Sequence, residues 1–131
     1  MTWYYQGKEF TEDDINDHFG FVYLISHIPS GRKYIGKKFF SKAGYKQVKG
    51  KRKKIRKTSD WLKYWGSNKE LQEEIKTNGE EQYQREILYL CKSRSECSYY
   101  ETYEIFVRNA LLSESYYNSW VSVKVRKDHL I

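Results

Sequence analysis

The stretch GFVYLISHIPSGRKYIGKK, residues 20–38, decides the fold of this chain. Two runs rich in β-branched and aromatic residues flank a Pro-Ser-Gly sequence, a pattern typical of a β-hairpin. Side chains alternate between the two faces of a strand. With a turn of even length, Tyr23 on the first strand therefore shares a face with Tyr34 and Gly36 on the second. The stretch predicts two phenols on the same side of a hairpin, beside a glycine.

The amino-acid composition indicates which class of molecule the protein binds. The chain has 131 residues, which is typical of a domain with a single core, and we expect one domain over residues 1–131. It carries 24 Lys and Arg against 17 Asp and Glu, a formal net charge of +7. Such an excess favours a polyanionic partner, nucleic acid before membrane.

Cysteine content and hydropathy indicate an intracellular setting. Cys91 and Cys97 do not form a metal-ligand spacing, so we expect reduced thiols rather than a disulfide scaffold. No apolar run approaches the roughly 18 residues that cross a membrane. The polar, acidic N-terminus does not resemble a signal peptide. We therefore expect a cytoplasmic protein with no membrane partner.

The rest of the chain predicts an α+β fold, in which a small and mostly antiparallel sheet is flanked by helices. Strand and helix patterns succeed one another without an internal repeat. The expected elements are a strand or aromatic plug at 3–5, a turn or helical turn capped by Thr11, a short helix at 60–67, a helix at 68–79, a strand at 82–91, a helix at 97–112 and a strand or extended tail at 120–125.

Capping residues mark the two longer helices. Ser67 or Asn68 is expected to cap the first helix, and Gly79 to follow its last turn. Ser93 and Glu96 match a capping box at the start of the second. The side chains expected to share one stripe of that second helix are Tyr100, Tyr103 or Glu104, Val107 and Leu111.

Residues 42–59 form a polar stretch that contains the basic run KGKRKKIRK at 49–57. We interpret this stretch as a surface arm inserted after the hairpin. Its concentrated positive charge favours contact with DNA phosphates, which carry little sequence information. The cations expected to bind DNA are Lys49, Lys51, Arg52, Lys53, Lys54, Arg56 and Lys57.

The order of these pieces resembles the GIY-YIG nuclease family, most of all the short stand-alone members encoded by tailed phages. GFVY at 20–23 stands for the first motif and YIG at 34–36 for the second. Glu101 begins a Glu-x-x-x-Ile sequence similar to that of the family's helix, and Asn118 matches the asparagine that closes the family's domain. The resemblance covers about residues 20–118.

This resemblance implies a DNA endonuclease that hydrolyses phosphodiester bonds with a divalent metal, Mg²⁺ or Mn²⁺. It implies that Glu101 holds the metal, since Mg²⁺ takes oxygen ligands and keeps several waters. Tyr23 would act as general base and Tyr34 would orient the attacking water, although the two roles can be exchanged. Lys37, next to the second motif, would favour the phenolate.

The family also places a catalytic arginine on a helix soon after the second motif, where this chain has its basic arm. Counting back from the following helix gives Arg56 or Arg52 as the residue that stabilises negative charge on the phosphate. Gly36 would let the phosphate approach the backbone. Asn118 would position the site rather than take part in the chemistry.

Two other functions fit the same residues. One is a catalytically inactive nucleic-acid-binding protein on this fold. The other is a small protein-binding module whose basic arm docks an acidic partner. The sequence leaves open the form of the DNA, its sequence specificity and the oligomeric state.

Overall fold

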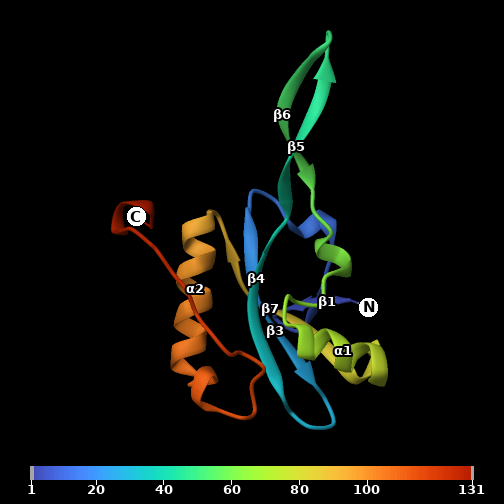
Figure 1. Ribbon diagram of the computed structural model, residues 1–131, viewed down its shortest axis with the longest axis vertical. Coiled ribbons are helices and arrows are strands. Elements are labelled where there is room, and N and C mark those ends of the chain that lie inside the picture. The colour runs from blue at the N-terminus through green and yellow to red at the C-terminus, as the bar shows by residue number, and fades with distance from the viewer. Residues whose placement is uncertain (1, 131) are drawn as a thin grey trace.

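Two helices enclose a five-stranded sheet in the computed structural model, which describes residues 2–130 (Figure 1). The strands of this sheet are β1 (Trp3–Tyr5), β2 (Lys8–Phe10), β3 (Gly20–His27), β4 (Lys33–Phe39) and β7 (Tyr83–Cys91). Their order is β2-β1-β7-β3-β4, and neighbours are antiparallel except for β1 and β7, which run parallel. The expected α+β class is therefore confirmed.

The two helices lie on opposite faces of the sheet (Figure 1). Side-chain alternation along β3 sends Tyr23 into an aromatic cluster with helix α1 (Lys69–Asn78). The same alternation sends Val22 into a mainly aliphatic cluster with helix α2 (Arg94–Val107). Within residues 2–130, no helix is long and apolar enough to span a membrane.

The predicted hairpin forms between β3 and β4 and is longer than the apolar runs suggested. Tyr23 lies opposite Gly36, and Ile25 lies opposite Tyr34. Directly opposed residues in an antiparallel pair share a face. Both phenols therefore occupy the α1 side of the sheet, as the sequence predicted.

The ends of both helices follow from capping residues. Asn68, rather than Ser67, caps α1, and its Oδ1 accepts a hydrogen bond from a first-turn N–H at 2.9 Å. Gly79 ends α1 with a φ of +94°, a conformation that favours glycine. At the start of α2, Ser93 Oγ accepts a hydrogen bond from the Glu96 N–H at 3.1 Å.

Helix α2 differs from the expected helix in its length and its buried face. It ends at Val107, and Ala110–Leu112 forms a separate 3-10 turn. Tyr103 and Val107 are 47% and 58% exposed, whereas Glu104 and Ile105 are buried. Burial of Glu104 is tolerated because its carboxylate has two hydrogen-bond donors as partners. Of the expected stripe, Tyr100 packs against the buried cluster and Glu104 is buried in place of Tyr103, whereas Val107 lies outside the buried face.

Two other segments complete the comparison with the sequence. The segment 60–67 contains one 3-10 turn, Trp61–Lys63, in place of a short helix, although Trp61 is buried. Residues 120–125 form an extended tail, one of the two expected alternatives, rather than a strand. The turn Glu12–Asp14 does carry the expected cap.

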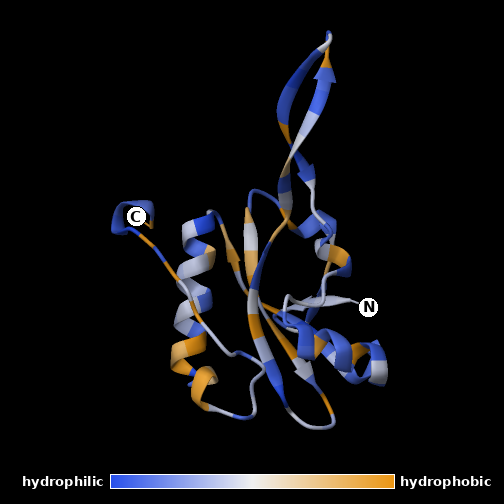
Figure 2. Ribbon diagram, viewed as in Figure 1, coloured by the Kyte–Doolittle hydropathy of each residue, from blue (hydrophilic) through white to orange (hydrophobic). Residues whose placement is uncertain are grey.

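The basic arm folds into a hairpin of its own, β5 (Ser41–Val48) and β6 (Lys51–Thr58), which does not pair with the main sheet. Lys49 and Gly50 form its turn, with φ values of +50° and +75° that suit a tight hairpin. The strands escaped the sequence analysis because neither shows the apolar–polar alternation of a half-buried strand. Figures 1 and 2 show the hairpin projecting beyond the sheet, hydrophilic along most of its length.

Tyr23 lies directly against the backbone of Gly36 on the neighbouring strand. A Cβ atom at residue 36 would overlap the hydroxyl group and ring carbons of Tyr23. The phenol cannot move aside, because Trp3 and Tyr64 pack edge-on against it with ring centroids at 5.5 and 6.0 Å. Glycine is therefore the residue that fits at position 36.

Gly36→Ala should destabilise the protein by about 1–3 kcal/mol, because the added methyl group has to displace a fully packed ring. Gly44→Ala on β5 is the matched control, since its Cβ would meet only the flexible side chain of Lys57. That change should stay within about 0.5 kcal/mol. Urea unfolding of both variants measures the difference. Equal losses would show that contact with Tyr23 is not the reason for glycine at 36.

Candidate active site

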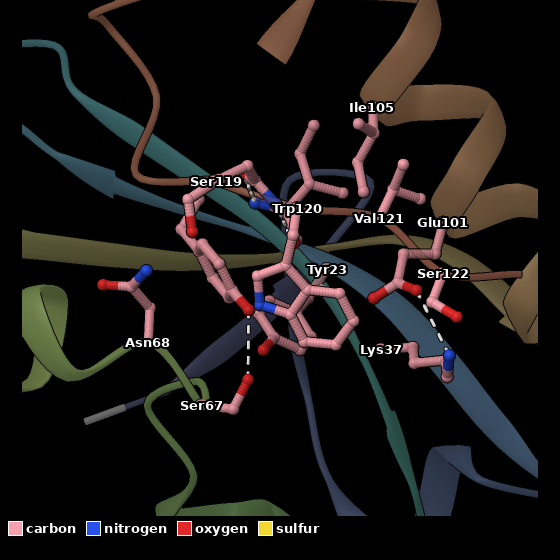
Figure 3. Close-up of a pocket in the computed structure, with 14 residues that line it drawn as sticks. Tyr23, Lys37, Ser67, Asn68, Glu101, Ile105, Ser119, Trp120, Val121 and Ser122 are labelled. Atoms are coloured by element: carbon pink, nitrogen blue, oxygen red, sulfur yellow. Dashed lines mark hydrogen bonds and ion pairs between the residues drawn. The ribbon is translucent and has the colours of Figure 1, made fainter. Parts of the chain in front are cut away.

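A pocket opens at β4, the outermost strand, where both faces of the sheet can contribute side chains (Figure 3). The phenols come from the α1 side, a carboxylate comes from α2 on the other side, and the segment that follows α2 forms a further wall. Six residues predicted for the site line this pocket: Tyr23, Tyr34, Gly36, Lys37, Glu101 and Asn118.

The two phenols lie next to each other, with ring centroids 6.2 Å apart. Tyr34 Oη is hydrogen-bonded to Ser67 Oγ at 3.1 Å. Burial raises the pKa of Tyr23 well above its usual range, and the nearby Tyr64 and Tyr34 raise it further. Burial also raises the pKa of Tyr34, against the opposite effect of its hydrogen bond to Ser67. Both phenols are therefore neutral at pH 7 unless positive charge is brought to them.

The space over Gly36 is taken by the ring and hydroxyl of Tyr23. From the sequence, we expected this glycine to make room for a phosphate. The structure instead makes room for a phenol, whose hydroxyl crosses β4 toward the pocket. The glycine thus acts on the site through the placement of Tyr23.

Glu101 points from α2 into the pocket and meets Lys37 from β4 (Figure 3). The distance from Lys37 Nζ to Glu101 Oε1 is 3.2 Å. Burial raises the pKa of the Glu101 carboxyl, and the Lys37 ammonium partly offsets that effect. Lys37 was expected to act on the phenols, but its charge is directed at Glu101. A partly buried carboxylate with one cationic partner in a cleft is typical of a functional site.

The oxygen atoms of the pocket fit a hard divalent ion with few protein ligands. Glu101 is the acidic side chain of the pocket, and Ser67 and the two phenols add neutral oxygens. In the described chain, 2–130, no group of three or more His, Cys, Asp or Glu could hold an ion. Mg²⁺ and similar ions need fewer, because they keep several waters when bound. Glu101 would be the protein ligand.

Asn118 seals the outer edge of β4. Its Nδ2 donates a hydrogen bond to the Ile35 carbonyl at 2.9 Å, and its Oδ1 accepts one from the Ile35 N–H at 3.0 Å. The side chain thereby replaces a neighbouring strand. It also fixes the chain that follows, in which Trp120 lies at the pocket with 75% of its surface exposed (Figure 3).

The structure does not bring Arg52 or Arg56 to the pocket. Arg56 makes three hydrogen bonds of 2.9–3.1 Å to Ser41 at the base of the β5–β6 hairpin. Arg52 lies farther out on the hairpin, with its guanidinium 4.0 Å above the Tyr45 ring. Within residues 2–130, Lys37 is the one Lys or Arg side chain that lines the pocket.

Among the lining residues that were not predicted for the site are Ser67 and Trp120. Ser67 looked like a helix cap, and the actual cap is the next residue. Trp120 looked like part of a strand. The sequence marked these positions only by a tryptophan in a polar tail and by a serine after a glycine, and neither pattern by itself indicates a functional site.

Residues 3–121 match a family model described as "Putative endonuclease segE, GIY-YIG domain". The match covers most of the chain, so the chain belongs to this GIY-YIG endonuclease family. The resemblance inferred from the motifs is thereby confirmed. A search of curated proteins and a search of solved structures gave no match.

Glu101→Gln should leave the fold intact and stabilise it slightly at neutral pH. The folded pKa of Glu101 lies above the ordinary 4.5, so ionisation above that pH weakens folding. The advantage of the Gln variant should therefore vanish near about pH 4 and grow as pH rises through the folded pKa. Thermal unfolding across this range measures it.

Glu104→Gln is the matched control on the same helix. Glu104 is 3.0 Å from Arg108 and accepts a hydrogen bond from Tyr89, so its loss should destabilise the protein at neutral pH. If Glu101→Gln destabilised the protein to the same degree, Glu101 would be an ordinary structural ion-pair residue.

Proposed function

We propose that this chain is a divalent-metal-dependent endonuclease that hydrolyses DNA phosphodiester bonds. We further propose that it is a stand-alone enzyme encoded by a phage and acting in the host cytoplasm. The observation that supports this best is the meeting of Tyr23, Tyr34 and Glu101 in one pocket, from three separate elements of the fold. Membership of a GIY-YIG endonuclease family supports the nuclease activity.

Glu101 is the residue we assign to metal binding. Bound Mg²⁺ or Mn²⁺ would supply positive charge for the phosphate and the leaving oxygen. Lys37 orients the Glu101 carboxylate through its 3.2 Å contact. We also assign to Lys37 the phosphate contact that was expected of Arg52 or Arg56, because Lys37 is the cation at the pocket.

The phenols are the groups we assign to proton transfer. With the positive charge of a bound metal ion at the pocket, Tyr23 would lose its proton to solvent, and its phenolate Oη would take the proton of the attacking water while Tyr34 Oη holds that water in place. Tyr23 is anchored in the aromatic cluster, so its hydroxyl position is well defined. In the exchanged assignment, Tyr34 is the base and Tyr23 orients the water. Its support is the hydrogen bond between Tyr34 and Ser67, which acts to lower the pKa of Tyr34 against the larger rise caused by burial. In either assignment the raised pKa values require positive charge at the pocket.

The β5–β6 hairpin is the surface we assign to DNA binding. Residues 45–54 of the hairpin are all exposed, and the basic run at 49–57 lies on its turn and on β6. The lysines of this run can contact phosphates, which contribute affinity whatever the sequence, whereas Arg56 is hydrogen-bonded to Ser41. The hairpin continues from β4, the strand that also carries Tyr34 and Lys37.

Nicking of supercoiled plasmid DNA tests this function. Cleavage should occur with Mg²⁺ or Mn²⁺ and should stop with EDTA. Linear, branched and single-stranded DNA in the same assay define the preferred substrate. DNA binding without any metal-dependent cleavage would favour the alternative, an inactive nucleic-acid-binding protein on the same fold.

Tyr23→Phe and Tyr34→Phe should each reduce cleavage by about 10²–10⁴-fold, because they remove the hydroxyl groups that handle protons. Melting temperatures should stay close to the native value. Tyr83→Phe is the control, since Tyr83 is also buried and hydrogen-bonded, to Asn78 at 3.0 Å, but does not line the pocket. A folded Tyr23→Phe protein with native cleavage rates would rule out Tyr23 as the base.

Removing hairpin lysines should weaken the salt dependence of DNA binding. Each phosphate contact contributes about 0.9 to the slope of log affinity against log salt for duplex DNA. The variant changes Lys51, Lys53, Lys54 and Lys57 to Ala, and its slope should fall by roughly two to three units. Fluorescence anisotropy at several salt concentrations measures it.

A control with the same loss of charge lies outside the hairpin. It changes four exposed lysines elsewhere to Ala: Lys8, Lys63, Lys69 and Lys76. Its slope should remain close to native. Equal changes in the two variants would mean that net charge, rather than the hairpin, governs binding.

A further inference from the structure

The β5–β6 hairpin has two chemically different faces. Directly opposed residues in its register share a face. The lysine face carries Lys42, Lys46, Lys51, Lys53 and Lys57, with no arginine. The arginine face carries Tyr45, Gln47, Arg52, Lys54 and Arg56. Positive charge on both faces serves phosphate binding, but phosphate binding does not require the arginines and the glutamine to be sorted onto one face.

Side chains on the arginine face are oriented by contacts within the hairpin. The Arg52 guanidinium lies 4.0 Å above the Tyr45 ring, a contact that restricts its position on the arginine face. Gln47 lies directly opposite Arg52. Arg56 is bonded to Ser41 at the base of the hairpin and is not available in the same way. Two exposed side chains with paired polar atoms therefore lie next to each other near the turn.

These two residue types are the ones that recognise purines. Arginine binds the O6 and N7 of guanine in bidentate fashion, and glutamine binds the N6 and N7 of adenine. Lysine is a flexible point charge that suits phosphates. The sorting of residues between the two faces thus matches the division between base contacts and backbone contacts.

The size of the hairpin suits the major groove. That groove is about 12 Å wide and admits a two-stranded ribbon. Each strand has eight residues and extends roughly 26 Å at about 3.3 Å per residue. An isolated two-stranded hairpin is marginally stable in water, and residues 45–54 are exposed on both faces. A ribbon in the groove would turn one face toward the base edges, and long side chains of the other face could reach the phosphates along the groove walls.

We propose that the β5–β6 hairpin enters the major groove of duplex DNA and reads base pairs with Arg52 and Gln47, while the lysine face binds phosphates. This proposal deepens the proposed nuclease function and rests on it for duplex DNA as the partner. It differs from a sequence-independent clamp because it gives the hairpin a role in specificity. The enzyme then prefers sites with a guanine beside an adenine.

Selection from a randomised duplex library tests the proposal without cleavage. The native protein, in EDTA, should enrich a short motif that contains guanine. Arg52→Lys keeps the charge but loses the planar fork, so the preference at one base pair should fall by roughly five- to a hundredfold. Its affinity for random-sequence DNA should stay within about twofold of native. Gln47→Ala should weaken the sequence preference at an adjacent base pair.

Lys53→Ala on the opposite face is the matched control. It should weaken binding to all sequences alike and leave the motif unchanged. The proposal fails if the native protein enriches no motif, if Arg52→Lys and Gln47→Ala both retain the native motif, or if Lys53→Ala abolishes it. Circular dichroism of each variant checks that the fold is native.

A parallel plasmid-nicking assay separates this proposal from the proposed function. If the native protein cleaved DNA but enriched no motif, the proposed nuclease function would stand and the proposed reading role of the hairpin would be wrong. An enriched motif without cleavage would leave the reading role intact and remove the nuclease.

Discussion

The contact between Tyr23 and Gly36 is the constraint on which the site depends. Tyr23 belongs to an interior strand, so its hydroxyl reaches the pocket only by crossing the outer strand β4. At the crossing point the chain has room for no side chain. The aromatic cluster holds the ring, and the missing Cβ lets the hydroxyl pass. The same burial raises the pKa of the Tyr23 phenol. The packing that fixes the position of the hydroxyl group therefore also makes it a weaker acid.

Because the pocket lies at the edge of the sheet, a small number of residues is enough to form the site. At an outer strand, side chains from both faces reach the same space, so Glu101 on α2 can face phenols from the α1 side. An unpaired edge is normally a liability, since its backbone groups are open to other chains. Here Asn118 pairs with both backbone groups of Ile35, and Lys33 bridges to Tyr116. The edge is thus closed at Lys33 and at Ile35, the latter within the pocket lining itself.

The sequence predicted the parts of the structure that local pattern encodes. The β3–β4 hairpin follows from its alternation and turn, and the motif order indicated Tyr23, Tyr34 and Glu101. Local pattern could not show that Lys37 pairs with Glu101, 64 positions away. The β5–β6 hairpin was missed because its strands have no apolar face. The arginine assignment depended on counting through that hairpin, and in the structure both arginines lie on it.

Arg85 shows how an irregular segment can form a well-defined pocket wall. Its Nη1 donates hydrogen bonds to the carbonyls of Leu62 and Tyr64, at 3.1 and 2.8 Å. Its guanidinium lies between the rings of Trp3 and Trp65, at 4.6 and 4.4 Å. Burial lowers the pKa of Arg85 to about 10, so the group stays charged at neutral pH. A buried charged donor thus supports the segment around the 3-10 turn Trp61–Lys63, which leads into Ser67 beside Tyr34.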